Sequence, residues 1–142
     1  MPNSQGASLD DSILIDIRTA CNVDESDNGF DFKLIPLTNT YISKAHDLGA
    51  GYEGFSINGT RETWRDWLGD QGELLMSVKT WVGYKVRLLF DPPENSSMVK
   101  VFETAIEDLG YAIRDKCCYE GLAAEYIPKH AELYSDSEDD DE

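Results

Sequence analysis

Positive charge is scarce in this sequence. Its 142 residues include 12 lysines and arginines against 28 aspartates and glutamates, so the formal net charge at pH 7 is −16. The last eight residues, 135–142, contain six of the acids and no base, and subtracting these six leaves −10 for the rest. A surface of this sign repels nucleic acid. Binding of DNA or RNA by phosphate neutralisation is therefore excluded as the basis of function.

Cysteine and histidine are also rare. The three cysteines, Cys21, Cys117 and Cys118, are odd in number and form no CxxC pair, which excludes a disulfide framework and a zinc site of the usual spacing. The two histidines, His46 and His130, are not spaced with an acid and a nucleophile in a catalytic pattern. We therefore expect no enzymatic activity, no metal and no cofactor.

Long apolar runs are missing. No window approaches the roughly 20 apolar residues of a membrane span. The first six residues show no basic region followed by an apolar core, as a secretory signal would. We expect a chain that is made in the cytoplasm and does not enter a membrane.

Two loop-forming stretches resemble ligand sites without matching them. The acidic residues of 21–29 lack the ligand spacing and the closing glutamate of an EF-hand loop. The glycines of 49–59 are not followed by a Lys-Ser or Lys-Thr pair, so they form no phosphate loop. In the second stretch, Phe55-Ser56-Ile57 alternates apolar and polar residues before the tight-turn signal Asn58-Gly59. This pattern predicts a short hairpin or an extended arm.

Apolar residues that recur every three or four positions are the main positive signal, and they predict helices. The expected helices cover residues 9–20, 30–49, 60–68, 73–90 and 97–116. Ser8 and Asp11 have the spacing of a capping box before the first helix. Pro36 leaves two alternatives for the second: it is harmless if the helix starts near Leu34 and produces a kink if the helix starts at Asp31.

The predicted core has two parts. In the short helix, Trp64, Trp67 and Leu68 share a face and are expected to be core anchors. The two long helices are expected to bury a shared set of apolar side chains between them: Leu74, Val78, Trp81, Val82, Val86, Leu89, Phe102, Ile106 and Leu109.

The sharpest local signal is Phe90-Asp91-Pro92-Pro93, which we call the elbow. Proline cannot donate a backbone hydrogen bond, and it pushes the residue before it out of the α region. The fourth helix must therefore end at about Phe90. Ser96 or Ser97 can then cap the next helix. The elbow predicts a stiff corner between two long antiparallel helices.

The expected fold class is all-α: a small helical bundle with two long antiparallel helices, a short extended arm or hairpin, and flexible termini. Residues 1–8 are small and polar and are expected to be disordered. Residues 9–116 form the helical domain. Residues 117–134 are rich in aromatic residues but lack the regular apolar spacing that forms a core, which is typical of a docking segment. Residues 135–142 form an acidic, disordered tail.

Several of these pieces occur in an order that resembles the small helical head–tail connector (adaptor) proteins of tailed bacteriophages. These pieces are Ser12-Ile13-Leu14-Ile15-Asp16-Ile17, Asp47-Leu48-Gly49, Gly54-Phe55-Ser56-Ile57, Thr63-Trp64-Arg65-Asp66-Trp67-Leu68, Val78-Lys79-Thr80-Trp81-Val82 and Val86-Arg87-Leu88-Leu89-Phe90-Asp91-Pro92-Pro93. The resemblance covers about residues 9–116. Beyond Lys116 the chain departs from the family pattern, because the usual members end soon after this point.

The resemblance implies a structural virion protein at the neck of the particle, without catalytic residues. Such subunits form a ring, dodecameric in the family, beneath the portal of the filled capsid. The ring extends the DNA channel, lets DNA pass without specific binding, and offers a surface to the head-closure (stopper) or tail proteins. The expected partners are therefore further copies of the chain, the portal protein, and a stopper or tail protein.

Two segments are candidates for these interfaces. The first is the arm, with Phe55, Ile57 and Asn58. The second is the docking segment, with Tyr119, Leu122, Tyr126, Ile127, Leu133 and Tyr134. The composition leaves one alternative open: strong acidity is equally typical of a DNA mimic or an anti-host inhibitor that binds a basic partner.

Overall fold

The computed structural model describes residues 8–121, with side chains through residue 117. Its elements are α1 (Ile13–Ala20), α2 (Asp31–Asp47), α3 (Trp64–Leu68), a 3₁₀ turn (Gly72–Leu74), α4 (Leu75–Phe90) and α5 (Ser96–Gly121). The described residues form no strand, and the only β-type pairing among them is one antiparallel bridge between Ser12 and Thr63. The prediction of an all-α fold is confirmed.

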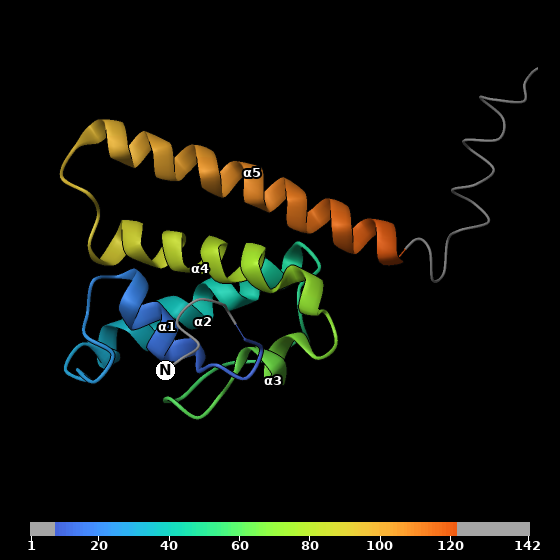
Figure 1. Ribbon diagram of the computed structural model, residues 1–142, viewed down its shortest axis with the longest axis horizontal. Coiled ribbons are helices and arrows are strands. Elements are labelled where there is room, and N and C mark those ends of the chain that lie inside the picture. Colours follow the sequence, from blue (N-terminus) through green and yellow to red (C-terminus); the bar gives the residue numbers. More distant parts are fainter. Residues whose placement is uncertain (1–7, 122–142) are drawn as a thin grey trace, which may run out of the picture.

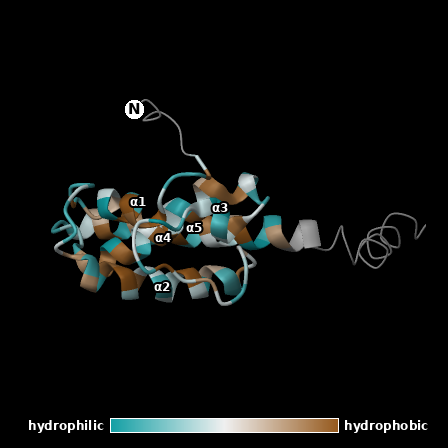
Figure 2. Cartoon of the chain, turned by 90° about the horizontal axis from the view of Figure 1, so that it is seen from below, coloured by the Kyte–Doolittle hydropathy of each residue, from teal (hydrophilic) through white to brown (hydrophobic). Residues whose placement is uncertain are grey.

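Helix α4 lies at the centre of the arrangement. It packs against α1 and α2 on one side and against α5 on the other. Figure 1 shows α5 running antiparallel to α4 along the opposite side from α1 and α2. The helices carry alternating hydrophobic and hydrophilic bands (Figure 2), as expected for amphipathic helices that each bury one face.

Helix α1 begins at Ile13, four residues later than predicted, and its cap is Ser12, whose Oγ accepts a hydrogen bond from the Ile15 N–H at 3.3 Å. The predicted cap, Ser8, instead closes a turn with Asp11. The cause is a long-range contact, because the Leu9 carbonyl accepts from the Arg65 N–H at 2.7 Å. The segment before α1 thus satisfies free N–H groups at the start of α3 and is not itself helical.

In α2, the structure selects the second of the two alternatives for Pro36. The helix begins at Asp31, so Pro36 lies inside it and removes one backbone hydrogen bond to Phe32. Both residues lie on the exposed side of the helix. The unpaired Phe32 carbonyl therefore faces the side on which water can replace the lost donor.

The predicted hairpin does not form. Residues 51–60 contain no strand, and α2 holds this arm through a side chain. Asn39 accepts from the Ile57 N–H at 2.7 Å and donates to the Ile57 carbonyl at 3.0 Å. Phe55 stacks on Trp67 with the ring centroids 6.1 Å apart. Because an asparagine satisfies the backbone groups that a second strand would have paired, the segment needs no strand partner.

Helix α4 ends at Phe90, as the double proline predicts, and the Asp91 N–H bonds back to the Arg87 carbonyl at 2.7 Å. Helix α5 starts at Ser96. Its cap is Asn95, whose Oδ1 accepts from the Ser97 N–H at 2.7 Å, so the predicted serine cap is wrong. At its other end α5 continues five residues past the predicted end at Lys116.

Burial confirms most of the predicted core. Trp64, Trp67 and Leu68 are at most 2% exposed, and the Trp64 indole N–H donates to Asp16 Oδ2 at 2.7 Å. Among the residues predicted for the two long helices, Leu109 is partly buried. The prediction that Leu89 belongs to the core is wrong: its side chain is 59% exposed, because it lies in the last turn of α4, beside the corner. The remaining seven are buried: Leu74, Val78, Trp81, Val82, Val86, Phe102 and Ile106.

Candidate assembly surfaces

The way α5 is packed leaves open surface on both of its flanks. Within the described residues α5 packs mainly on α4, and it also meets the end of α2 at Gly49. Phe102 faces α4, where its ring stacks on Tyr84 with the centroids 4.5 Å apart. A 26-residue helix held mainly on one neighbour exposes much of its circumference. The fold therefore presents surfaces along α5 on which another protein can pack.

A shallow groove of about 220 Å³ lies on the α2 side of α5. Leu48 and Tyr111 line it, and Trp81 and Lys85 of α4 also contribute. The Lys85 ammonium lies 5.4 Å from the centre of the Trp81 ring, which keeps the charge over an aromatic face. Gly110 lets Trp81 approach α5, since a Cβ there would lie 3.3 Å from the indole Nε1. The groove is thus partly apolar, and charged residues of both signs, Lys85, Glu107 and Arg114, also line it.

A second groove of about 260 Å³ lies between α1 and α4. It is lined in part by Ile17 and Ala20 of α1 and by Gly83 and Tyr84 of α4. A Cβ at Gly83 would lie 3.1 Å from the Ala20 Cβ, so glycine at this position sets the close spacing of the two helices. Of these two grooves, the first has α5 residues in its lining and the second does not.

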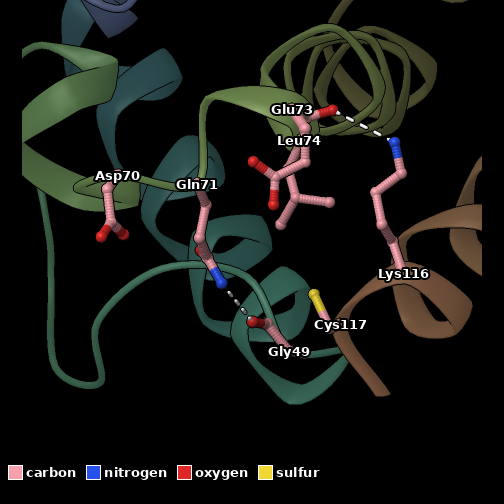
Figure 3. A pocket seen from close by; sticks show the side chains of 7 residues that line it. All are labelled: Gly49, Asp70, Gln71, Glu73, Leu74, Lys116 and Cys117. Atoms are coloured by element: carbon pink, nitrogen blue, oxygen red, sulfur yellow. Dashed lines mark hydrogen bonds between the residues drawn. The ribbon is translucent and has the colours of Figure 1, made fainter. Parts of the chain in front are cut away.

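A polar hollow of about 550 Å³ lies where the ends of α2 and α5 meet (Figure 3). Gln71 donates to the Gly49 carbonyl at 3.4 Å, and Lys116 reaches the Glu73 carbonyl at 3.5 Å. Gly49 has φ +116°, and a Cβ there would overlap Cys117, 2.8 Å from its Sγ and closer to its Cβ. The Leu48-Gly49 pair thus ends α2 in a form that lets α5 pack directly against it.

No metal site emerges in the described part of the chain. Among residues 8–121, no three histidine, cysteine, aspartate or glutamate side chains are placed to hold a metal ion. No helix in the same range is long and apolar enough to cross a membrane. His46 Nδ1 lies 3.2 Å from both the Ala50 and the Gly51 carbonyl oxygens, where it can only donate. This histidine therefore ties the last turn of α2 to the loop that follows it.

Cys21 is a buried thiol at the end of α1, 1% exposed. Burial raises the pKa of Cys21 from about 9 to about 12. Below pH 9 the thiol is neutral in both the folded and the unfolded chain, so its full contribution to the free energy of unfolding is present. Between pH 9 and pH 12 it ionises in the unfolded chain while it stays neutral in the folded protein, and this contribution is lost. At pH 10.5 the loss relative to pH 8 is expected to be about 2 kcal/mol.

Chemical denaturation of the wild type and of Cys21→Ala at pH 8 and pH 10.5 measures this loss. Cys21→Ala is expected to be less stable at pH 8, because it leaves a cavity, but to lose about 2 kcal/mol less on going to pH 10.5. Equal losses in the two proteins would show that ionisation of the Cys21 thiol does not cause the loss of stability at alkaline pH.

The sequence-derived interface residues lie in different environments. Phe55 is half-buried and Ile57 is 2% exposed. Asn58 is exposed, and its N–H donates to Glu62 Oε2 at 2.9 Å. Tyr119 belongs to α5. Leu122, Tyr126, Ile127, Leu133 and Tyr134 lie outside the described residues, and the interface role of the whole set stays a prediction.

The groove between α4 and α5 and the groove between α1 and α4 were missed by sequence reasoning. Their only sequence signal is a glycine within each of two amphipathic helices, Gly83 in α4 and Gly110 in α5. Such glycines point to close helix packing. They do not say on which side of the packed pair a groove stays open.

The comparisons with known proteins give one result. The profile of a family described as phage connector protein matches residues 13–120, from the start of α1 to the penultimate residue of α5. No curated protein and no solved structure matches the chain. The connector family is structural and non-enzymatic, which decides against the DNA-mimic or inhibitor alternative. The chain belongs to the phage connector protein family and is a structural head–tail connector of the virion neck.

Proposed function

We propose that the chain is one subunit of a ring, dodecameric as in the resembled family, that sits beneath the portal and joins the capsid to the tail. The observation that carries this proposal is the packing of α5, which is held mainly on α4 and leaves two large apolar side chains, Val101 and Tyr111, exposed. A closed ring requires two different surfaces on each subunit, one for each neighbour. The groove between α4 and α5, the groove between α1 and α4, and the exposed side chains of α5 supply surfaces of this kind.

The charge supports the channel role. A chain of net charge −16 that lines a ring presents a negative wall to DNA of the same sign. Such a wall holds DNA weakly and lets it slide. The proposal places the subunits in the host cytoplasm until they join the filled head, and it names the portal, a stopper or a tail protein as the partners on the two faces of the ring.

Two exposed residues on α5 test the ring contacts. Val101 and Tyr111 are each 55% exposed. Tyr111 lines the groove on the α2 side of α5, as does Gly110. Val101 is nine residues, or about two and a half helical turns, from Gly110, so it lies on the opposite flank of α5. Val101→Ser and Tyr111→Ser are each expected to lower the fraction of subunits in rings by about tenfold, because each removes apolar contact from one side of the interface.

Native mass measurement in the presence of portal rings gives this fraction. The matched control is Met76→Ser in the first turn of α4, where the side chain is 60% exposed and does not belong to α5. The thermal midpoints of all three variants are expected to stay close to that of the wild type. Rings that form as well with Val101→Ser and Tyr111→Ser as with Met76→Ser would contradict the assignment of these contacts.

We further propose that residues 117–134 attach the ring to the portal. Deleting 122–142 keeps all of α5 and is expected to leave the melting temperature within a few degrees, because the described core lies upstream. Attachment to purified portal is expected to be lost, as measured by co-sedimentation. The control is deletion of the acidic tail alone, 135–142, which retains attachment. Unchanged attachment in the longer deletion would remove the docking role from this segment.

A further inference from the structure

Two segments that are far apart in the sequence form one end of the molecule, which we call the elbow end. They are residues 22–32, the α1–α2 loop with the start of α2, and residues 89–98, the elbow with the start of α5. Figure 1 shows both at the same end of the bundle. Asn22 Nδ2 donates to Asp91 Oδ2 at 3.2 Å, and the Phe30 and Phe90 rings meet edge to face with centroids 5.4 Å apart. The two segments therefore form one joined surface.

This end carries a concentration of exposed apolar side chains. Among the described residues eight large apolar side chains are exposed, and four of them lie here: Phe30 (42%), Phe32 (70%), Leu89 (59%) and Met98 (43%). They come from three elements and were not predicted as a set, because Leu89 has the periodicity of a core residue. Apolar side chains that gather at one exposed end are typical of a surface that another protein covers.

The charge at the same end is predominantly negative. The two segments contain six acids, Asp24, Glu25, Asp27, Asp31, Asp91 and Glu94, and no lysine or arginine. Arg18, from α1, is buried against Asp31 at 2.7 Å and neutralises that carboxylate alone. Arg87 is partly buried: its Nε donates to the Asp91 carbonyl at 3.1 Å, and its guanidinium lies 5.1 Å from the centre of the Phe102 ring. Lys33, the next residue along α2, lies over the Phe32 ring.

These charges restrict what can cover the patch. DNA has the same sign and is repelled. A second copy that packed through the same end would bring these six acids against the same six acids. We propose that the elbow end docks a different protein of the virion, one that presents cationic side chains around an apolar pocket. This inference rests on the proposed function, and it adds that the elbow is a partner surface as well as a corner between helices.

The test uses the full-length chain, with connector-free heads and separate tails from a phage that carries a nonsense codon in this gene. Phe32→Ser/Leu89→Ser is expected to weaken binding to heads or to tails by at least about tenfold. Glu25→Gln/Glu94→Gln, which removes two charges without removing apolar contact, is expected to flatten the salt dependence of the same binding. Both variants are expected to keep the wild-type melting temperature and oligomer mass.

The matched control is again Met76→Ser, whose side chain has nearly the same exposure as that of Leu89 but lies at the other end of α4. The inference is overturned if Phe32→Ser/Leu89→Ser binds heads and tails within about twofold of wild type, if Met76→Ser weakens binding equally, or if the elbow-end variants lose the oligomer. Failure of the wild-type chain itself to bind either component would instead remove the proposed function, and this inference with it.

Discussion

Replacing Gly51 with alanine is expected to destabilise the protein by about 3 kcal/mol, the sum of a backbone cost and a steric cost. Gly51 has φ +67°, and a Cβ there would overlap the Trp67 indole, 2.5 Å from its Cε2 and closer to its Nε1 and Cδ1. The backbone cannot move away easily. Its N–H donates to Gln71 Oε1 at 2.7 Å, and the carbonyl accepts from His46. Trp67 is fully buried and cannot move outward without opening the core.

Gly54→Ala is the matched control for this change. Gly54 also has a positive φ, +79°, but a Cβ there would meet no atom within 4 Å. It therefore measures the backbone cost alone, about 1 kcal/mol. Thermal and chemical denaturation of the two variants give the difference, which is the steric cost at Trp67. Equal destabilisation at the two positions would mean that Trp67 is not packed against residue 51.

Replacing Arg18 with methionine is expected to cost about 3 kcal/mol. The Arg18 side chain is 5% exposed and holds Asp31 in a two-bond fork, with Nη2–Oδ2 at 2.7 Å and Nε–Oδ1 at 3.1 Å. Its Nη1 also donates to the Glu25 carbonyl. Methionine keeps much of the buried volume but leaves a carboxylate and a carbonyl without their donors. The loop between α1 and α2 is expected to loosen with the loss of stability.

Two further variants separate the buried charge from the general effect of removing an arginine. Arg65→Met breaks an ion pair with Asp10 at 2.8 Å in which both side chains are mostly exposed, and it is expected to leave the midpoint of unfolding unchanged. Arg18→Met/Asp31→Leu removes both partners and is expected to recover part of the loss. If Arg18→Met and Arg65→Met had equal effects in urea denaturation, the buried pair would have no special role.

The sequence predicts those parts of the fold that depend on local chemistry. The double proline at Pro92 and Pro93 ends α4 at Phe90 because the backbone of proline itself forbids the helix to continue. Trp64 and Trp67 are core anchors because their size and spacing put them on one face of a short helix. Each of these features is determined within a few residues of chain.

The features that were missed depend on contacts between distant segments. Ser8 does not cap α1, because the carbonyls beyond it bond to the N–H groups of α3. The hairpin at Ile57 is absent because Asn39 of α2 supplies both hydrogen bonds. Leu89 is exposed although its spacing matches that of Val82 and Val86, because periodicity shows which face of a helix is apolar and not whether its last turn, beside the corner, is covered.

The candidate surfaces follow the same division. The acidity that suits a DNA channel can be read from composition alone. The elbow end becomes visible only when the fold brings residues 22–32 and 89–98 together. The two grooves likewise require knowledge of how α1, α4 and α5 pack together.

The central claim is that this chain is a connector subunit that forms a ring on the portal. Native mass measurement of the wild-type protein, alone and mixed with purified portal rings, tests it most directly. We expect a complex of one portal ring with a complete ring of connector subunits, whether or not the connector forms a ring by itself. A chain that stays monomeric with portal, and binds a basic nucleic-acid-binding protein in a salt-sensitive way, would contradict the account.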